Sequence, residues 1–126
     1  MKEFDELVEA LKKSRRECPW AREVITKEHI ERLKDEVREL TEAIKKGDKD
    51  EIRDEIGDVI WDALFIAIIE EEKGNLAIKE IFERAVQKLK RRKPWVFGNE
   101  IVKTPEEAVR RWNEIKKLEK EGKIRV

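Results

Sequence analysis

The chain has 126 residues, of which 48% are charged and 39% hydrophobic, and this predicts one helical domain over residues 1–126. Thirty basic residues balance thirty acidic ones, so the composition lacks the basic excess of a protein that binds nucleic acid. Cys18 is the only cysteine and no apolar run is long enough to span a bilayer, so we expect a cytoplasmic protein with no membrane partner. Abundant Lys, Arg and Glu with scarce Asn and Gln favour a thermophilic source.

The first half of the chain predicts two helices. Apolar residues recur at helical spacing over residues 2–15, and Pro19 prevents this helix from continuing because it lacks a backbone N–H. A second helix is expected over residues 27–46, with Thr26 as its N-cap and Gly47 at its end.

A third helix is expected from Asp48, as its capping residue, to Lys73. Its second half, residues 59–69, is apolar nearly all round and needs cover on most sides. A chain of this size offers little of that cover itself, so this segment predicts an intertwined homodimer.

Two further helices complete the pattern. One is expected from Asn75, as its cap, to Arg92, followed by a loop over residues 93–103. Thr104 then caps the last helix, which runs to about residue 121. No segment alternates apolar and polar residues as a strand would, so the expected fold class is all-α, an antiparallel helical hairpin or bundle with short connections.

Four carboxylates are placed symmetrically about the turn at Gly47. Glu39 and Glu55 each lie eight residues from Gly47, and Glu36 and Asp58 each lie eleven residues from it. Two antiparallel helices therefore bring these side chains to matching heights, where each pair of carboxylates at about 5 Å would repel by roughly 3 kcal/mol. An all-oxygen cluster of this kind suits Mg²⁺ or Mn²⁺. The alternative is that these acids lie on solvated faces with Lys or Arg partners.

Asp62 lies one turn beyond Asp58, inside the apolar run, where an unpaired carboxylate is costly. It either extends the metal or substrate site or pairs with a Lys or Arg of another helix or subunit. His29, the only histidine, is expected to be an ordinary residue on a helix face.

Several blocks of the sequence resemble the MazG-type nucleoside triphosphate pyrophosphohydrolases. That family has a Glu-Glu-x-x-Glu run followed by Glu-x-x-Asp, and residues 35–39 and 55–58 match it, with Asp35 in place of the first Glu. Further matching blocks are 18–20, 88–98, 104–107 and 111–116. Departures from the common family residues concern base specificity and leave the four carboxylates in place; they are Ala21, Val24-Ile25-Thr26, Asp62, Lys93 and Trp95.

The resemblance implies hydrolysis of a nucleoside triphosphate to the monophosphate and pyrophosphate, with Glu36, Glu39, Glu55 and Asp58 holding Mg²⁺. It also implies that cations near the end of the fourth helix bind phosphate and that a tryptophan packs on the base. The expected substrate-binding residues are Lys88, Arg91, Arg92, Trp112 and Asp62. For the cations, the alternative role is compensation of a helix dipole.

The resemblance favours a broad enzyme that cleans the nucleotide pool. Two alternatives stay open: a pyrophosphohydrolase selective for one deoxynucleotide or for phosphoribosyl-ATP, and a non-catalytic helical dimerisation module whose acids are only solvated.

Overall fold

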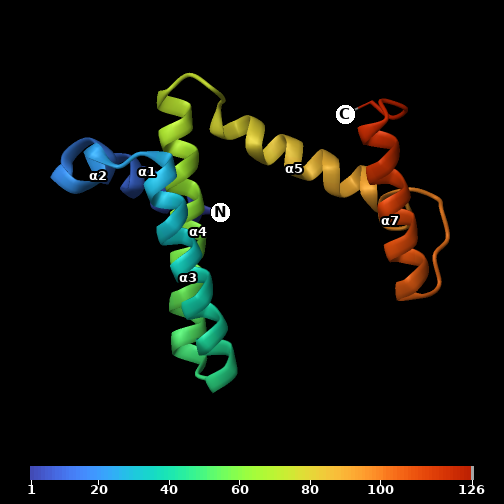
Figure 1. Ribbon diagram of the computed structural model, residues 1–126, viewed down its shortest axis with the longest axis horizontal. Helices are drawn as coiled ribbons and strands as arrows, with labels where there is room; N and C mark the ends of the chain where they lie inside the picture. Colours follow the sequence, from blue (N-terminus) through green and yellow to red (C-terminus); the bar gives the residue numbers. More distant parts are fainter. Residues whose placement is uncertain (126) are drawn as a thin grey trace. The chain divides into compact units, whose positions relative to one another are not determined.

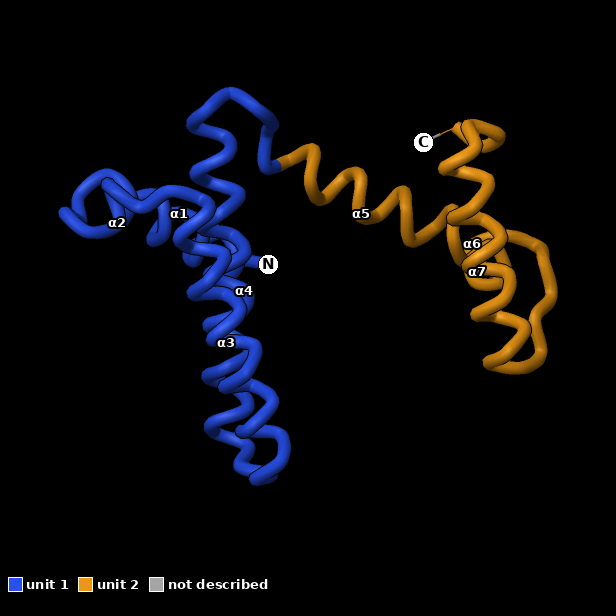
Figure 2. The backbone as a smooth tube through the Cα atoms, viewed as in Figure 1, with its two compact units in different colours: residues 1–78 blue, residues 79–126 orange. Residues whose placement is uncertain are grey.

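The computed structural model describes residues 1–125, and this part of the chain forms seven helices and no strand (Figure 1). The all-α fold class expected from the sequence is therefore confirmed. None of the described helices is both long enough and apolar enough to cross a membrane. The chain divides into two compact units, unit 1 over Met1–Ile78 and unit 2 from Lys79 onward (Figure 2).

Unit 1 is built on a hairpin of two long helices, α3 (Thr26–Lys46) and α4 (Lys49–Glu72). Gly47 makes the turn with a φ of 71°, which glycine adopts without the steric cost of a Cβ, and its N–H bonds to the carbonyls of Ala43 and Ile44. The Asp48 side chain accepts hydrogen bonds from the first backbone N–H groups of α4. The predicted turn and cap are thus confirmed.

Helix α1 (Lys2–Glu17) and the short α2 (Pro19–Glu23) cover the apolar second half of α4. Two groups of buried side chains result: Leu11 with Leu64 and Ile68, and Ala21 and Val24 with Phe65 and Ile69. Most of the cover that the sequence analysis assigned to a partner subunit is therefore supplied by this chain. The five-residue α2 lies in a segment for which no helix was expected.

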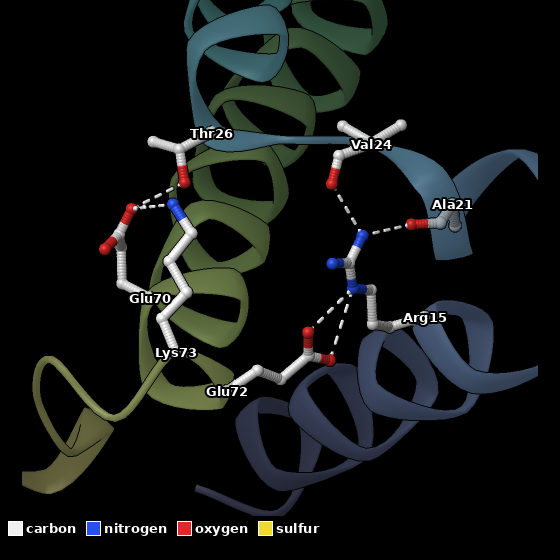
Figure 3. Close-up of polar contacts among 7 residues, drawn as sticks. All are labelled: Arg15, Ala21, Val24, Thr26, Glu70, Glu72 and Lys73. Carbon is white, nitrogen blue, oxygen red and sulfur yellow. Dashed lines mark hydrogen bonds and ion pairs between the residues drawn. The ribbon is translucent and has the colours of Figure 1, made fainter.

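Arg15 of α1 forms hydrogen bonds with α2, with the residue after α2 and with the end of α4 (Figure 3). Its Nη1 donates to the carbonyls of Ala21 and Val24, at 2.5 Å and 2.7 Å, and its Nε donates to the Glu72 carboxylate at 3.1 Å. These carbonyls lie within and just after the five-residue α2, where a short helix leaves carbonyls without a backbone partner, so one guanidinium satisfies two of them.

Thr26 and Asn75 do not cap helices as the sequence predicted. Ile25 precedes α3 and donates its N–H to Glu28, while Thr26 donates its hydroxyl to the Glu70 carboxylate at 2.6 Å. Asn75 donates to the same carboxylate at 2.7 Å. These hydrogen bonds, that of Thr26 first, lower the pKa of Glu70 to about 2. The Thr26 hydroxyl therefore joins the start of α3 to the end of α4 (Figure 3), whereas Asn75 ties the segment after α4 to the same carboxylate.

Unit 2 contains nearly all of α5 (Ile78–Arg92), together with the short α6 (Pro94–Phe97) and α7 (Pro105–Lys120). Helix α6 lies within the segment expected to be a loop. Thr104 caps α7 as predicted, because its hydroxyl accepts the Glu107 N–H at 3.2 Å. No residue of α5 is buried, whereas α7 buries Ile115.

Candidate active site

Three carboxylates meet across the α3–α4 hairpin. Glu36 and Glu39 on α3 and Glu55 on α4 each offer an oxygen, and these oxygens all lie within 4.8 Å of one another. Their meeting follows from the register that Gly47 sets, since Glu39 and Glu55 lie at equal distances from the turn. Asp58, the fourth predicted ligand, lies outside this set but is close enough for its charge to act on Glu36 and Glu55.

The cluster has polar atoms that the described part of the chain does not satisfy. One oxygen of Glu36 and one of Glu55 are buried without a hydrogen-bond partner. Burial, followed by the proximity of Glu39 and Asp58, raises the pKa of Glu36 to about 7, and burial also raises the pKa of Glu55. A positive charge between these acids would favour their ionised form.

The donor set fits a hard divalent cation. Carboxylate oxygens that converge from two helices, with unsatisfied lone pairs, are the ligands that Mg²⁺ and Mn²⁺ bind. A cavity of about 420 Å³ opens beside Glu39 and Glu55, and Arg38 and Lys46 contribute to its wall. A metal with part of an anionic ligand therefore has room at this site.

Asp62 is buried one turn beyond Asp58 and forms a pair with His29. His29 Nε2 lies 3.0 Å from Asp62 Oδ1, both residues are 1% exposed, and Arg32 Nε lies 3.9 Å from the same oxygen. The expectation that His29 is an ordinary helix-face residue is wrong. Burial lowers the pKa of His29 and raises the pKa of Asp62, so His29 is neutral near pH 7.

The sequence contained a signal for His29 that was missed. His29 lies four residues before Leu33 and seven before Glu36, on the face of α3 that turns toward α4. A polar side chain on such a face needs a partner on the facing helix, and Asp62 is the polar residue in the apolar part of α4.

The predicted phosphate-binding residues lie in unit 2. Lys88 is exposed, whereas Arg91 and Arg92 both bond to the carboxylate of Glu119 on α7, with Arg92 Nη2 at 2.8 Å. The hydrogen bond from Arg92, followed by the one from Arg91, lowers the pKa of Glu119 to about 2. Glu119 was not foreseen, because it is 27 residues from Arg92 and no local pattern links the two.

Trp112, the tryptophan expected to bind substrate, and Trp95 line one cavity in unit 2. This cavity measures about 400 Å³, and Lys93 and Val109 complete most of its wall. The Arg92 guanidinium lies 5.3 Å from the centre of the Trp112 ring. The cavity thus combines a flat apolar wall with positive charge, a combination that suits part of a nucleotide.

Comparisons with known proteins agree on the family. The model of the MazG nucleotide pyrophosphohydrolase domain matches residues 25–97, which include the three clustered carboxylates and Asp58. The crystal structure of a MazG-related protein from Thermotoga maritima superposes with a TM-score of 0.79 and 35% identity, over 90% of this chain and 98% of that one.

Two longer relatives carry functional names. The nucleoside triphosphate pyrophosphohydrolase/pyrophosphatase MazG of Thermotoga maritima is 34% identical over 93% of this chain and 45% of its own. The nucleoside triphosphate pyrophosphohydrolase of Escherichia coli K12 is 30% identical over 84% of this chain and 40% of its own. This chain spans about half, or less, of the length of the curated relatives it matches first. Since the family model covers more than half of the chain and includes the acidic cluster, the protein belongs to the MazG nucleotide pyrophosphohydrolase family.

Proposed function

We propose that this protein hydrolyses nucleoside triphosphates to nucleoside monophosphates and pyrophosphate in a reaction that depends on Mg²⁺, with Mn²⁺ as a possible substitute. The observation that carries the proposal is the convergence of Glu36, Glu39 and Glu55 within 4.8 Å, with two buried oxygens unsatisfied. The names of the relatives support the same reaction.

Glu36, Glu39 and Glu55 would hold the cation, with Asp58 as a fourth ligand or as the acceptor of a proton from water. Bound there, a divalent cation neutralises phosphate charge and lowers the pKa of a water molecule. The carboxylates themselves fix the position of this charge because they lie on two helices joined by a tight turn. Phosphoryl transfer depends chiefly on such positioning and charge stabilisation.

The two units carry opposite charge. Unit 1 has 22 acidic and 15 basic residues, whereas unit 2 has 8 acidic and 15 basic residues. Unit 2 is therefore suited to an anionic ligand, and we assign Lys88 and Arg92 to phosphate, with Arg91 and Trp112 in support. Because Glu119 pairs with both arginines, it holds their guanidinium groups in place when no phosphate is bound.

A homodimer is part of the proposal. Ile30, Val37 and Ile44 lie seven residues apart on α3, and each is at least 39% exposed. Side chains at this spacing form one stripe along a helix, and a second copy of the hairpin would remove the stripe from water.

The test is incubation with each of the four nucleoside triphosphates and Mg²⁺, followed by separation of the products. Monophosphate with pyrophosphate is expected, and diphosphate with phosphate would exclude the reaction. Glu39→Gln should lose at least about a hundredfold in kcat, since it keeps the shape of the side chain and removes a ligand charge. Glu31→Gln, on the same helix but paired with Lys34, is the matched control and should stay active.

The same assay excludes or supports the alternative of a dimerisation module. Such a module would turn over no nucleotide, and Mg²⁺ would not raise its melting temperature more than Na⁺ of equal ionic strength. Turnover of all four bases within about tenfold of one another would support a broad pool-cleaning enzyme.

A further inference from the structure

Arg32 is held between two tryptophans next to the acidic cluster. Its guanidinium carbon lies 5.4 Å from the centre of the Trp20 ring and 5.8 Å from that of Trp61. The Arg32 side chain is still 49% exposed, so its donors reach solvent. A guanidinium fixed between two indole rings loses little freedom on binding a ligand.

The buried pair of His29 and Asp62 fixes Arg32 from the protein side. Asp62 Oδ1 lies 3.0 Å from His29 Nε2, within hydrogen-bond distance, and 3.9 Å from Arg32 Nε. Stacking of the His29 ring on Trp61, with 5.8 Å between centroids, links the pair to the aromatic side chains. The second oxygen of Asp62 is buried and has no hydrogen-bond partner in the described part of the chain. Such an atom lowers the stability of the fold, so a role in positioning Arg32 would account for its presence.

The location relative to the carboxylates suits the nucleoside part of a nucleotide. Arg32 lies four residues before Glu36, and Asp62 lies four residues after Asp58. Arg32 and Asp62 therefore lie about one helical turn, or about 6 Å, further along the hairpin than Glu36 and Asp58. Trp20 and Trp61 also line a cavity of about 260 Å³ whose other walls include Leu11 and Phe65. Beyond the metal ligands, unit 1 therefore offers an apolar hollow beside fixed hydrogen-bond donors.

We propose that Arg32, positioned by Asp62 and His29, selects nucleotides whose base presents keto oxygens, that is guanine, uracil or thymine, over adenine and cytosine. Arginine has five N–H donors and no acceptor. Guanine offers two neighbouring acceptors, O6 and N7, and uracil and thymine offer O4, whereas adenine and cytosine present an amino donor at that edge. The inference rests on the proposed function, because it concerns the base of the same substrate.

The test compares wild type with Arg32→Met and Arg32→Lys on GTP, UTP, ATP and CTP. Arg32→Met keeps an unbranched stem between the indoles and removes the donors. We expect its kcat/KM to fall about tenfold for GTP and UTP, mainly through KM, and less than about twofold for ATP and CTP. Arg32→Lys keeps a charge beside Asp62 but loses the planar fork, so we expect an intermediate loss of the same base dependence.

A metal-free measurement gives an independent readout. Quenching of tryptophan fluorescence by GMP should exceed quenching by AMP at equal concentration in wild type, and Arg32→Met should abolish the difference. Asp62→Asn should reduce it while leaving the Mg²⁺ affinity unchanged, as expected of a positioning residue.

The outcomes separate this inference from the proposed function. Equal losses for all four bases, or an unchanged order of bases in both Arg32 variants, would overturn the selection by Arg32. Failure of wild type to release monophosphate from any of the four would overturn the proposed function itself.

Discussion

Replacing Glu36 by Gln tests whether the acidic cluster lowers the free energy of unfolding when no metal is bound. The pKa of this carboxyl is about 7 in the folded protein, compared with an ordinary value of 4.5. The folded state therefore holds a proton that the unfolded state releases between about pH 4.5 and pH 7, and by linkage the stability falls as the pH rises through this range.

A shift of this size corresponds to about 3 kcal/mol at 1.36 kcal/mol for each pH unit. Glu36 is partly exposed, so solvent screening reduces the expected effect to about 1–2 kcal/mol. A Gln amide resembles the protonated carboxyl and can still donate to Glu39 or Glu55. Without metal, Glu36→Gln should therefore be more stable than wild type by about 1–2 kcal/mol at about pH 8 and nearly equal to it at about pH 4.

The assay is urea denaturation at these two pH values in EDTA, repeated with Mg²⁺. Saturating Mg²⁺ should reverse the order at about pH 8, because wild type gains about 2–3 kcal/mol from the bound ion at a hundred times its dissociation constant and the variant gains less. Glu31→Gln controls for the loss of one negative charge from α3. A variant less stable than wild type at both pH values in EDTA would refute the strain assigned to the cluster.

Three further predictions follow from contacts elsewhere in the molecule. Arg15→Met should lower the free energy of unfolding by about 2–3 kcal/mol, because two backbone carbonyls lose a charged donor; a loss under about 0.5 kcal/mol in urea denaturation would contradict this. Glu119→Gln should be less stable than wild type by about 2 kcal/mol near neutral pH. This difference should vanish as the pH falls from about 4.5 towards 2, since the folded-state pKa of Glu119 is depressed. Urea denaturation at about pH 7 and pH 3 measures the difference, and an equal value at both would exclude the ion pair as its source. Val37→Glu should convert a dimer into a folded monomer in size-exclusion chromatography with light scattering, whereas a monomeric wild type would remove the premise.

Features set by neighbouring residues could be predicted from the sequence. The turn at Gly47, the cap at Asp48 and the cap at Thr104 each depend on a few adjacent residues, and all three occur as expected. The meeting of Glu39 with Glu55 was also predictable, because a two-residue connection transfers distances along one helix directly to the other.

Features set by partners far apart in the chain could not be predicted in this way. Thr26 is a good capping residue, yet Glu70, 44 residues away, competes for its hydroxyl. Arg91 and Glu119 are separated in the same way, and neither has a periodic signal that identifies the other. The second half of α4 was assigned to a partner subunit because the sequence does not reveal that α1 folds back over it.

The buried polar side-chain atoms that lack a hydrogen-bond partner among residues 1–125 all belong to the two helices of the hairpin. They are one oxygen each of Glu36, Glu55 and Asp62 and one nitrogen of His29, and no atom of the described residues pairs with them. The apolar side chains of the same unit are packed by α1 and α2, and neither apolar cluster includes these four polar residues. Because every such atom makes folding less favourable, their occurrence both in the acidic cluster and in the pair beside Arg32 is better explained by one extended ligand than by separate structural needs. A metal complex at the carboxylates and a base at Arg32 would be the two ends of a nucleotide, and both proposals therefore rest on polar residues of the same two helices.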